Sequence, residues 1–514
     1  MTSSLTPRTG ALLLAWALGV YGVLGGLPMQ PAHELHLSLA QHALSAFTSV
    51  WSTQWDLGHS FAGHPPLLHQ MIALLARVPF VGLERSYAVI IALTPVVLTA
   101  AMGLFVERLE SPRAGDVAAW LTAANPLGYL FLFPFGQAPF LVGTAFALVA
   151  GACWLSDTQG PRALVAGALF AAAAVCTHAA AVVALAVVAV MALTSRGATS
   201  RWRFGVLASG AAAVVIAALA LKPFIELMWA APAMPGSKLD GGNLVSTAVV
   251  WGMIAWSAVV SLGLGGRTGR LIGFVLIALA VLSVTHVMPG VAADKWLWLA
   301  AAFSATGWAL VSTTSVPPTL NARAGLVAVL GLLLTSSMVL GGSNNDGYGH
   351  RNNALREARI ALEQPGSESF RYLTLHVGAA RFELARRVRA PSLDTGLPWV
   401  AASSLKGTGF VNLDELPLGD ARGQAALDQV LAQADVLHLR WVITADSRAT
   451  RLLQSRGFDL RSAWKGDLTL WERPSVTPLE PPVAPPNSTS WPWAVMPLSS
   501  TALGLALFSW RRKS

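Results

Sequence analysis

Apolar runs recur along the first 342 positions of the chain, separated by short polar connections. Runs of about 20 residues are long enough for a helix to cross a hydrocarbon core about 30 Å thick. Helices are expected rather than strands, because lipid cannot satisfy the backbone groups of an open sheet. Twelve spans are predicted, at residues 10–29, 87–107, 115–134, 138–155, 162–177, 179–195, 204–228, 244–265, 270–287, 295–314, 323–342 and 491–510.

The pattern changes after Gly342. Residues 343–486 contain 16 acidic and 17 basic side chains, against 10 and 18 in all the rest of the chain. A segment of this size and polarity is typical of a soluble domain. Alternating apolar positions predict strands at residues 371–377, 436–444 and 468–472, and helices at 379–389 and 448–457. We therefore expect a mixed α/β domain, followed by a proline-rich linker.

The predicted fold class is a polytopic α-helical membrane protein of about 12 transmembrane helices, with a late extracytoplasmic α/β domain. Residues 1–342 are expected to form the transmembrane bundle, which includes a first extracytoplasmic loop at 30–86. Residues 343–486 form the soluble domain. Residues 487–514 complete the linker and add the final transmembrane helix.

Composition and charge support this organisation and exclude other classes. Hydrophobic residues make up 54% of the chain and charged residues 12%. The net charge of +9 does not indicate nucleic-acid binding, because the basic side chains concentrate in the termini and in one set of connections. That asymmetry predicts that both termini are cytoplasmic. The chain is rich in Ala, Val and Leu, and arginine far exceeds lysine, which is typical of a high-GC bacterium. We therefore expect a bacterial inner membrane, with the soluble domain in the periplasm.

Titratable groups gather in the first predicted loop. It holds six of the 11 histidines of the chain, together with Glu34 and Asp56. Ionisable residues at one face of a membrane protein usually mark its functional site. The histidines are His33, His36, His42, His59, His64 and His69.

A carboxylate at the mouth of a helix bundle can act as a general base, and burial can move its pKa toward the working pH. Glu34 and the adjacent His33 are the candidate catalytic residues. His33 and His36 could share a helix face and, with Glu34, hold a divalent ion such as Mg²⁺ or Mn²⁺. The spacing is not that of a zincin helix, because position 37 is Leu. The alternative is that these histidines are surface residues of an amphipathic helix at the membrane interface and have no role in a site.

Further candidates for substrate binding lie near the same predicted membrane face. His64 could contact a phosphate or a sugar, or it could cap the following helix. His178 interrupts an alanine-rich stretch. It could belong to the site, or it could lie at the membrane interface or form a hydrogen bond with a neighbouring helix. Lys222 could bind phosphate as a point charge, or form an i, i+4 pair with Glu226. His59 and Arg85 complete the predicted set, although Arg85 could equally contact lipid headgroups.

Several of these residues fall into an ordered pattern. Residues 32–44 begin Ala-His-Glu-Leu-His, a Trp- and Gly-containing turn follows, and His64-Pro65-Pro66-Leu67 leads back to the membrane. This order resembles the first loop of lipid-linked-sugar glycosyltransferases of the GT-C class. It is most similar to the branch of protein O-mannosyltransferases and aminoarabinose transferases. The similarity is best over residues 10–110 and diffuse to about residue 195.

The resemblance implies transfer of a sugar from a polyprenyl-phosphate donor to a lipid, glycan or protein acceptor at the outer membrane face. In that family an acidic pair activates the acceptor or helps to bind a metal, and basic residues hold the donor phosphate. Glu34 matches the family's Glu, but His33 stands where the family has Asp. Either Glu34 takes over the role of base, or His33 is the base, or the activity is lost or altered.

Two functions from other classes stay open at this point. A transporter or flippase of lipid-linked cargo would show paired repeats and charged or broken helices at mid-membrane, and no convincing repeat is present in the sequence. A non-catalytic scaffold of the cell envelope would use the soluble domain as its binding surface. The substitution of His33 for Asp keeps the scaffold alternative open.

Overall fold

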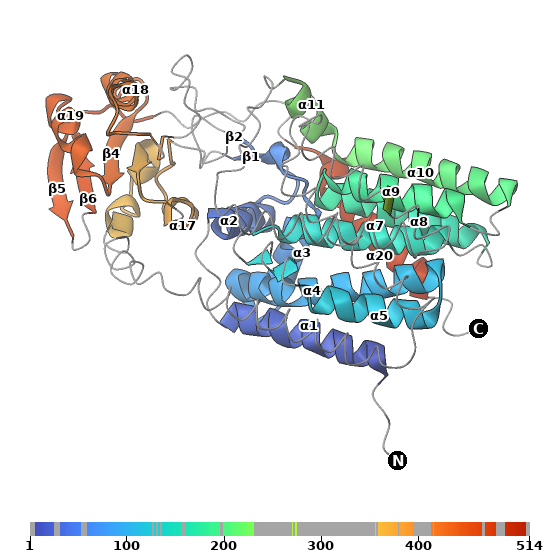
Figure 1. Ribbon diagram of the computed structural model, residues 1–514. Helices are drawn as coiled ribbons and strands as arrows, with labels where there is room; N and C mark the ends of the chain where they lie inside the picture. The colour runs from blue at the N-terminus through green and yellow to red at the C-terminus, as the bar shows by residue number, and fades with distance from the viewer. Residues whose placement is uncertain are drawn as a thin grey trace.

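The computed structural model describes a helical bundle and a smaller sheet-containing part (Figure 1). The statements below concern the described residues, which are 6–24, 31–52, 59–125, 128–129, 132–133, 136–155, 160–195, 199–230, 270, 273–274, 355, 358–378, 380–393, 413–414, 416–464, 468–479 and 489–509. The predicted spans between residues 244 and 342 lie outside them, except for positions 270, 273 and 274.

Long apolar helices form the bundle. Helices α1 (Pro7–Leu24), α4 (Gly82–Leu109), α10 (Ser200–Ala220) and α20 (Trp491–Ser509) are long and apolar enough to cross a membrane. The shorter helices are α3 (Leu67–Ala76), α5 (Pro112–Ala123), α7 (Ala138–Trp154), α8 (Pro161–Thr177), α9 (Ala181–Thr194) and α11 (Lys222–Ala230).

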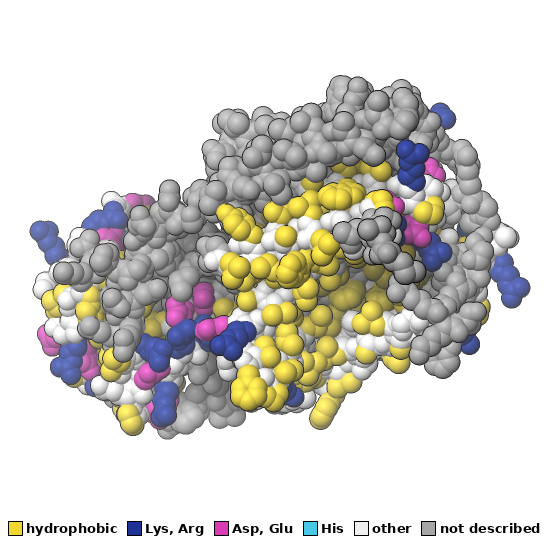
Figure 2. Space-filling view, turned by 90° about the horizontal axis from the view of Figure 1, so that it is seen from below, with side chains coloured by type: hydrophobic (Ala, Val, Ile, Leu, Met, Phe, Trp, Pro, Cys, Tyr) yellow, Lys and Arg dark blue, Asp and Glu magenta, His cyan; other side chains and the backbone are white. Residues whose placement is uncertain are grey.

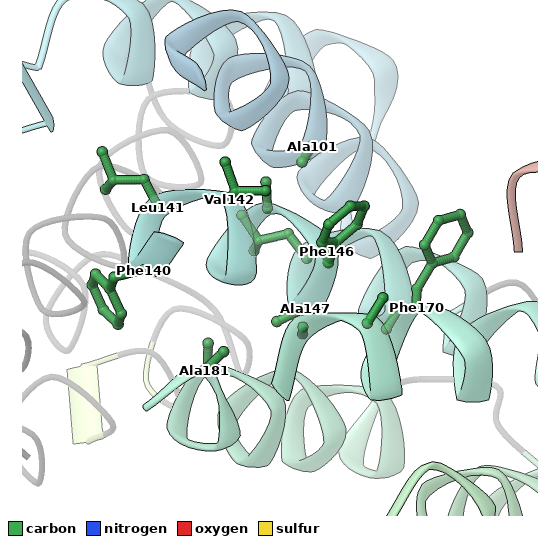
Figure 3. Packing of buried hydrophobic residues seen from close by; sticks show 14 of the residues in the cluster. Ala101, Phe140, Leu141, Val142, Phe146, Ala147, Phe170 and Ala181 are labelled. Atoms are coloured by element: carbon green, nitrogen blue, oxygen red, sulfur yellow. The ribbon is translucent and has the colours of Figure 1, made fainter. Parts of the chain in front are cut away.

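Helix α7 lies at the centre of the bundle, and almost all of its residues are buried. Phe146 of α7 stacks on Phe170 of α8, with a distance of 6.2 Å between the ring centroids. Ala101 of α4 and Ala181 of α9 belong to the same cluster (Figure 3). A helix that is apolar on every side packs well only when other helices surround it, and this explains its central place.

Two predicted spans are wrong in their extent. The continuous helix expected over residues 115–134 stops at Ala123, where α5 ends. The sequence continues Asn125-Pro126, and a residue before proline disfavours helical backbone. The span expected at 204–228 is divided at Leu221 between α10 and α11. In contrast, the predicted break between 162–177 and 179–195 is confirmed, because α8 ends at Thr177 and α9 begins at Ala181.

The late part of the chain, which is the described portion of residues 355–479, contains a four-stranded sheet of order β3-β4-β6-β5. Strands β3 (Arg371–Leu375) and β4 (Leu439–Thr444) are parallel, whereas β6 (Thr469–Glu472) is antiparallel to both β4 and β5 (Asp459–Ala463). Three helices accompany the sheet: α17 (Ala380–Arg387), α18 (Ala421–Ala432) and α19 (Thr450–Ser455).

Both faces of this sheet are covered. Leu373 and Leu375 of β3 join a core with Leu427 and Val430 of α18, and Tyr372 points into a second core. The second core includes Leu384 and Val388, from α17 and the residue that follows it. Successive side chains of a strand point to opposite faces, so Leu373 and Leu375 face one core and Tyr372 faces the other.

Apolar side chains cover the face of the bundle seen in Figure 2, while charged side chains gather toward its two ends. This is the distribution expected for a protein with a lipid-facing belt. Helix α1 begins and α20 ends at the end of the bundle farther from the sheet, and α2 (Pro31–Ser45) lies at the nearer end (Figure 1). Helix α17 lies between α2 and the sheet.

Candidate active site

Helix α2 carries the acidic motif of the first loop. Pro31 opens the helix, where its missing N–H is tolerated, and Glu34 in the first turn suits the positive end of the helix dipole. Leu37 and Ala40 face the bundle core, whereas Leu39 packs with Ala385 of α17. The short strands β1 (Trp51–Ser52) and β2 (His59–Ser60) and the 3-10 turn η1 (Phe61–Gly63) complete the loop. The late part of the chain therefore covers the outer side of α2.

Glu34 is buried under α17, with 7% of its surface exposed. Its Oε2 atom lies 3.5 Å from Nη2 of Arg386, whose side chain is 8% exposed. This is an ion-pair distance, longer than an ordinary hydrogen bond. Glu34 Oε2 and Arg386 Nε are both buried without a hydrogen-bond partner among the described residues. The carboxylate of Glu34 can therefore still accept a hydrogen bond, and the guanidinium of Arg386 can still donate one.

Burial raises the pKa of Glu34 above its ordinary value. The positive charges of Arg386 and Arg387 lower this pKa, and the negative charge of Glu383 raises it, but burial is the largest cause. A carboxyl group with a raised pKa is a stronger base once it is ionised. Glu34 therefore has the properties of a general base.

Arg386 and Arg387 also bind a second carboxylate on the membrane bundle. Glu84, in the first turn of α4, lies 3.3 Å from Arg386 Nη2 and 2.8 Å from Arg387 Nη2. Arg387 is also paired with Glu383, one turn earlier in α17, at 3.2 Å. Helix α17 is therefore held to α2 and α4 by charge pairs as well as by the apolar contact of Ala385.

His33 faces inward, away from α17, and is 3% exposed. Its Nε2–H donates to the carbonyl oxygen of Phe133 at 2.7 Å, since a carbonyl can only accept. The other nitrogen, Nδ1, lies 2.5 Å from the hydroxyl oxygen of Tyr87 and accepts a hydrogen bond from this hydroxyl. Burial lowers the pKa of His33, and the Phe133 carbonyl opposes this less strongly. His33 is thus a neutral imidazole whose lone pair is already engaged.

His36 also faces away from Glu34. Its Nε2–H donates to the carbonyl oxygen of Gly136 at 3.0 Å, and its Nδ1 lies 3.0 Å from Nε2 of His69. Burial lowers the pKa of His69 to about 4, so this ring is neutral near pH 7.

The metal set expected from His33, Glu34 and His36 does not fit this geometry. The two imidazoles direct their four ring nitrogens to Tyr87, Phe133, His69 and Gly136, and none of these nitrogens bonds Glu34. Among the described residues, no group of three or more His, Cys, Asp or Glu side chains is placed to hold a metal ion. The i, i+3 spacing brings the rings to one side of α2, but both rings bond neighbouring helices and loops.

A small cleft that is partly open to solvent lies beside α2 and α3. His42, His64, His69, Gln70 and Trp493 are among the residues that line it. His64 follows η1 in extended conformation, and its ring lies 6.4 Å from that of His69. Gln70 donates to the carbonyl of Trp493 at 2.9 Å, and its Oε1 atom is buried without a hydrogen-bond partner. Imidazole and amide groups thus face one small space.

The structure places the remaining predicted site residues on other elements. His178 forms the turn between α8 and α9, where its Nδ1 accepts from the N–H of Ala180. Lys222 and Glu226 form an exposed i, i+4 pair at 3.7 Å, which is one of the two expected arrangements. Arg85 is exposed and donates to the carbonyl of Phe80. The side chain of His59 lies outside the described residues.

The sequence interpretation missed the partners of Glu34 and His33. Arg386 and Arg387 belong to a segment that the sequence predicts to be a helix of the soluble domain, outside the predicted site. Its arginines were visible, but no local pattern connects them to residue 34. Tyr87 sits in an apolar span, where a single tyrosine is usually an interfacial residue.

Comparison of the sequence with protein-family models gives no match, and none of the curated proteins matches it. Comparison of the structure does find similar proteins. The aminoarabinose transferase ArnT from Cupriavidus metallidurans, solved with undecaprenyl phosphate, superposes with a TM-score of 0.55 at 12% identity. The alignment covers 91% of this chain and 97% of that one.

Two other membrane glycosyltransferases are similar. The arabinofuranosyltransferase AftD from Mycobacteria has a TM-score of 0.55 at 14% identity over 90% of this chain, which spans only 41% of that protein. The oligosaccharyltransferase from Archaeoglobus fulgidus, solved with Zn and sulfate, has a TM-score of 0.52 at 11% identity over 86% of this chain and 68% of that one. The chain is therefore a helical membrane protein with the fold of GT-C glycosyltransferases, as the first-loop pattern predicted.

Proposed function

We propose that the chain transfers a sugar from a polyprenyl-phosphate donor to an acceptor at the extracytoplasmic membrane face, with Glu34 as the general base. The observation that carries the proposal is the burial of Glu34, with a raised pKa, in the loop of a GT-C fold whose sequence carries the acidic motif. Two of the solved neighbours were obtained with lipid carriers, one with undecaprenyl phosphate and one with a dolichol-phosphate and an inhibitory peptide.

In the proposed reaction Glu34 takes a proton from the acceptor as the acceptor atom bonds to the anomeric carbon of the sugar. The bond between that carbon and the phosphate oxygen breaks, and polyprenyl phosphate leaves with the electron pair. A positioned base of this kind contributes about 10²- to 10⁴-fold to a rate. His33 is not the base in this scheme, because Tyr87 already donates to its lone pair.

We assign the donor to the side of α2 that faces the cleft, with His64 as the residue that contacts its phosphate or sugar. His64 lines the cleft together with His69 and Gln70, and the apolar wall includes Leu39 and Trp493. An imidazole N–H can donate to a phosphate oxygen even when the ring is neutral. One neighbour was crystallised with Zn, but His33, Glu34 and His36 do not fit a shared ion, so no step is routed through a metal.

The proposed topology follows from the same scheme. Twelve transmembrane helices would leave both termini in the cytoplasm and place the soluble domain at 343–486 in the periplasm of a bacterial inner membrane. The arginines of α17 would then meet Glu34 at the outer membrane face, where the lipid-linked donor is presented.

Transfer of a radiolabelled sugar tests the proposal. Membranes containing the protein would receive a panel of undecaprenyl-phosphate hexoses and pentoses, with wild type compared against Glu34→Gln and Glu84→Gln. Glu34→Gln keeps the shape of the side chain but removes the base, so we expect a loss of at least 100-fold. Glu84→Gln removes an exposed carboxylate of the same cluster and should leave most activity. Equal transfer by wild type and Glu34→Gln would refute the assignment of the base. No transfer from any donor would favour the scaffold alternative.

A further inference from the structure

Arg386 is contributed by the late part of the chain but lies against the candidate base of the first loop. Its Nη2 atom is 3.5 Å from Glu34 Oε2, and both side chains are more than nine-tenths buried. Arg386 also reaches Glu84 at 3.3 Å, so its guanidinium lies between a buried carboxylate and an exposed one. The positive charge of Arg386 lies next to the carboxylate of Glu34 and lowers its pKa.

The unpaired polar atoms of Glu34 and Arg386 indicate which chemical group could bind between the two side chains. Glu34 Oε2 can accept and Arg386 Nε–H can donate, and neither has a partner among the described residues. A buried polar group left unpaired is destabilising, because it has given up its hydrogen bonds to water. A hydroxyl group can donate to the first and accept from the second at once. To admit its oxygen, the two side chains would have to separate by about 2 Å.

A cationic amine that binds between Glu34 and Arg386 is repelled by the positive charge of Arg386. An ammonium group bonded to Glu34 Oε2 would lie about 4 Å from the guanidinium, where the two positive charges repel each other. A neutral hydroxyl does not experience this repulsion. Arg387 adds a second positive charge on the same helix, paired with Glu84 and Glu383.

We propose that Arg386 is a positioning and specificity-determining residue that completes the acceptor site with Glu34, so that the site takes uncharged hydroxyl acceptors and excludes cationic amines. The proposal rests on the proposed glycosyl transfer and deepens it, because it names the acceptor class. It also gives the late domain a direct part in the site, through α17. Arg386 acts through Glu34 and the acceptor oxygen, and it does not itself exchange a proton.

Charged and titratable groups from three elements face Glu34. Helix α17 brings Arg386, Arg387 and Glu383, and α4 brings Tyr87 and Glu84. On α2 itself, the neighbouring His33 is neutral and bonded elsewhere. Because Arg386 is the largest of the charge effects that lower the pKa of Glu34, its removal should shift the titration of Glu34 to higher pH.

The first test measures acceptor choice and pH dependence together. Wild type, Arg386→Gln, Arg386→Lys and Arg387→Gln would receive a labelled undecaprenyl-phosphate sugar and either an alkyl hexoside or its analogue with an amine in place of one hydroxyl. Wild type should prefer the hydroxyl acceptor at least tenfold. Arg386→Gln should reduce that preference to about threefold or less and move the acidic limb of the pH profile up by about one pH unit. Arg386→Lys should restore the limb. Arg387→Gln removes the smaller of the two arginine charge effects on Glu34, so it should move the limb less than Arg386→Gln does and keep the acceptor preference.

A second measurement does not depend on activity. The infrared band of the protonated carboxyl of Glu34, identified by its absence in Glu34→Gln, would be followed against pH in wild type and Arg386→Gln. An upward shift of its midpoint in Arg386→Gln is expected. If the midpoint shifts but no variant transfers sugar, the proposed function fails while the role of Arg386 at Glu34 stands. An unchanged midpoint, or an unchanged acceptor preference in an active Arg386→Gln variant, would overturn the proposal.

Discussion

At the scale of single residues, two neighbours on α2 have opposite roles. His33 and Glu34 are adjacent, and both are titratable and buried. His33 points into the bundle, where Tyr87 and the carbonyl of Phe133 use both of its ring nitrogens. Glu34 points toward α17, and its Oε2 atom has no hydrogen-bond partner in the part of the chain that the structure describes. The histidine therefore stabilises the structure, and the carboxylate has the capacity for chemistry.

His33→Ala tests this division of roles. The substitution leaves the Tyr87 hydroxyl and the Phe133 carbonyl without their buried partner, at a cost of about 1–3 kcal/mol. We expect a lower melting temperature in detergent, with transfer per folded molecule within about tenfold of wild type. Tyr87→Phe, which removes only the donor to Nδ1, is the matched control and should have a smaller effect on stability. Loss of transfer comparable with that of Glu34→Gln in a folded His33→Ala protein would instead identify His33 as the base.

At the scale of elements, close helix contacts hold the site in place. Gly19 of α1 lies against the backbone of Ala92 in α4, and the ring of Phe133 lies against Gly22. Small residues let transmembrane helices approach closely, and this approach replaces the hydrophobic driving force that lipid does not supply. The same contact holds α1, the helix that precedes α2 in the chain, against α4.

Gly19→Ala should weaken this contact. A Cβ atom at position 19 would overlap the carbonyl oxygen of Ala92, so α1 and α4 must separate. Overpacking of this kind costs about 1–3 kcal/mol. Gly210→Ala in α10 is the matched control, because nothing lies within 4 Å of the new methyl group. Thermal unfolding in detergent should show a lower melting temperature for Gly19→Ala alone. Equal melting temperatures would mean that α1 and α4 do not pack as described.

At the scale of the whole molecule, the late part of the chain contacts the first loop through α17. Ala385 packs with Leu39 of α2 and Phe61 of η1, and the arginine pairs lie beside this contact. This contact includes the candidate base, Glu34. A change that weakens it should therefore affect the site without altering either part internally.

Ala385→Glu is expected to separate the two parts. It places a charge without a partner in an apolar contact, at a cost of several kcal/mol. Hydrogen exchange should become faster in both α17 and the first turns of α2, and transfer activity should fall. Ala421→Glu is the matched control, since Ala421 is exposed in the first turn of α18, where an acidic residue is favourable. Unchanged exchange in α2 would show that α17 does not cover it.

The sequence by itself determined the features that depend on local patterns. Apolar run lengths gave most of the described helices of the bundle, including the break beside His178, and the first-loop pattern predicted the GT-C fold. The concentration of charge after Gly342 marked the change in character of the chain. These features follow from composition and spacing within a few tens of residues, because helix formation and membrane insertion respond to neighbours in the chain.

The tertiary structure alone decided which of the titratable residues face the candidate site. His33, His36 and Glu34 look alike in the sequence, but the bundle turns the two histidines inward and the late domain covers the carboxylate with Arg386. No local pattern connects residues 34 and 386, because their contact depends on how α17 packs against α2. Burial and charge pairing set the pKa of Glu34, and both arise only when segments distant in sequence are brought together.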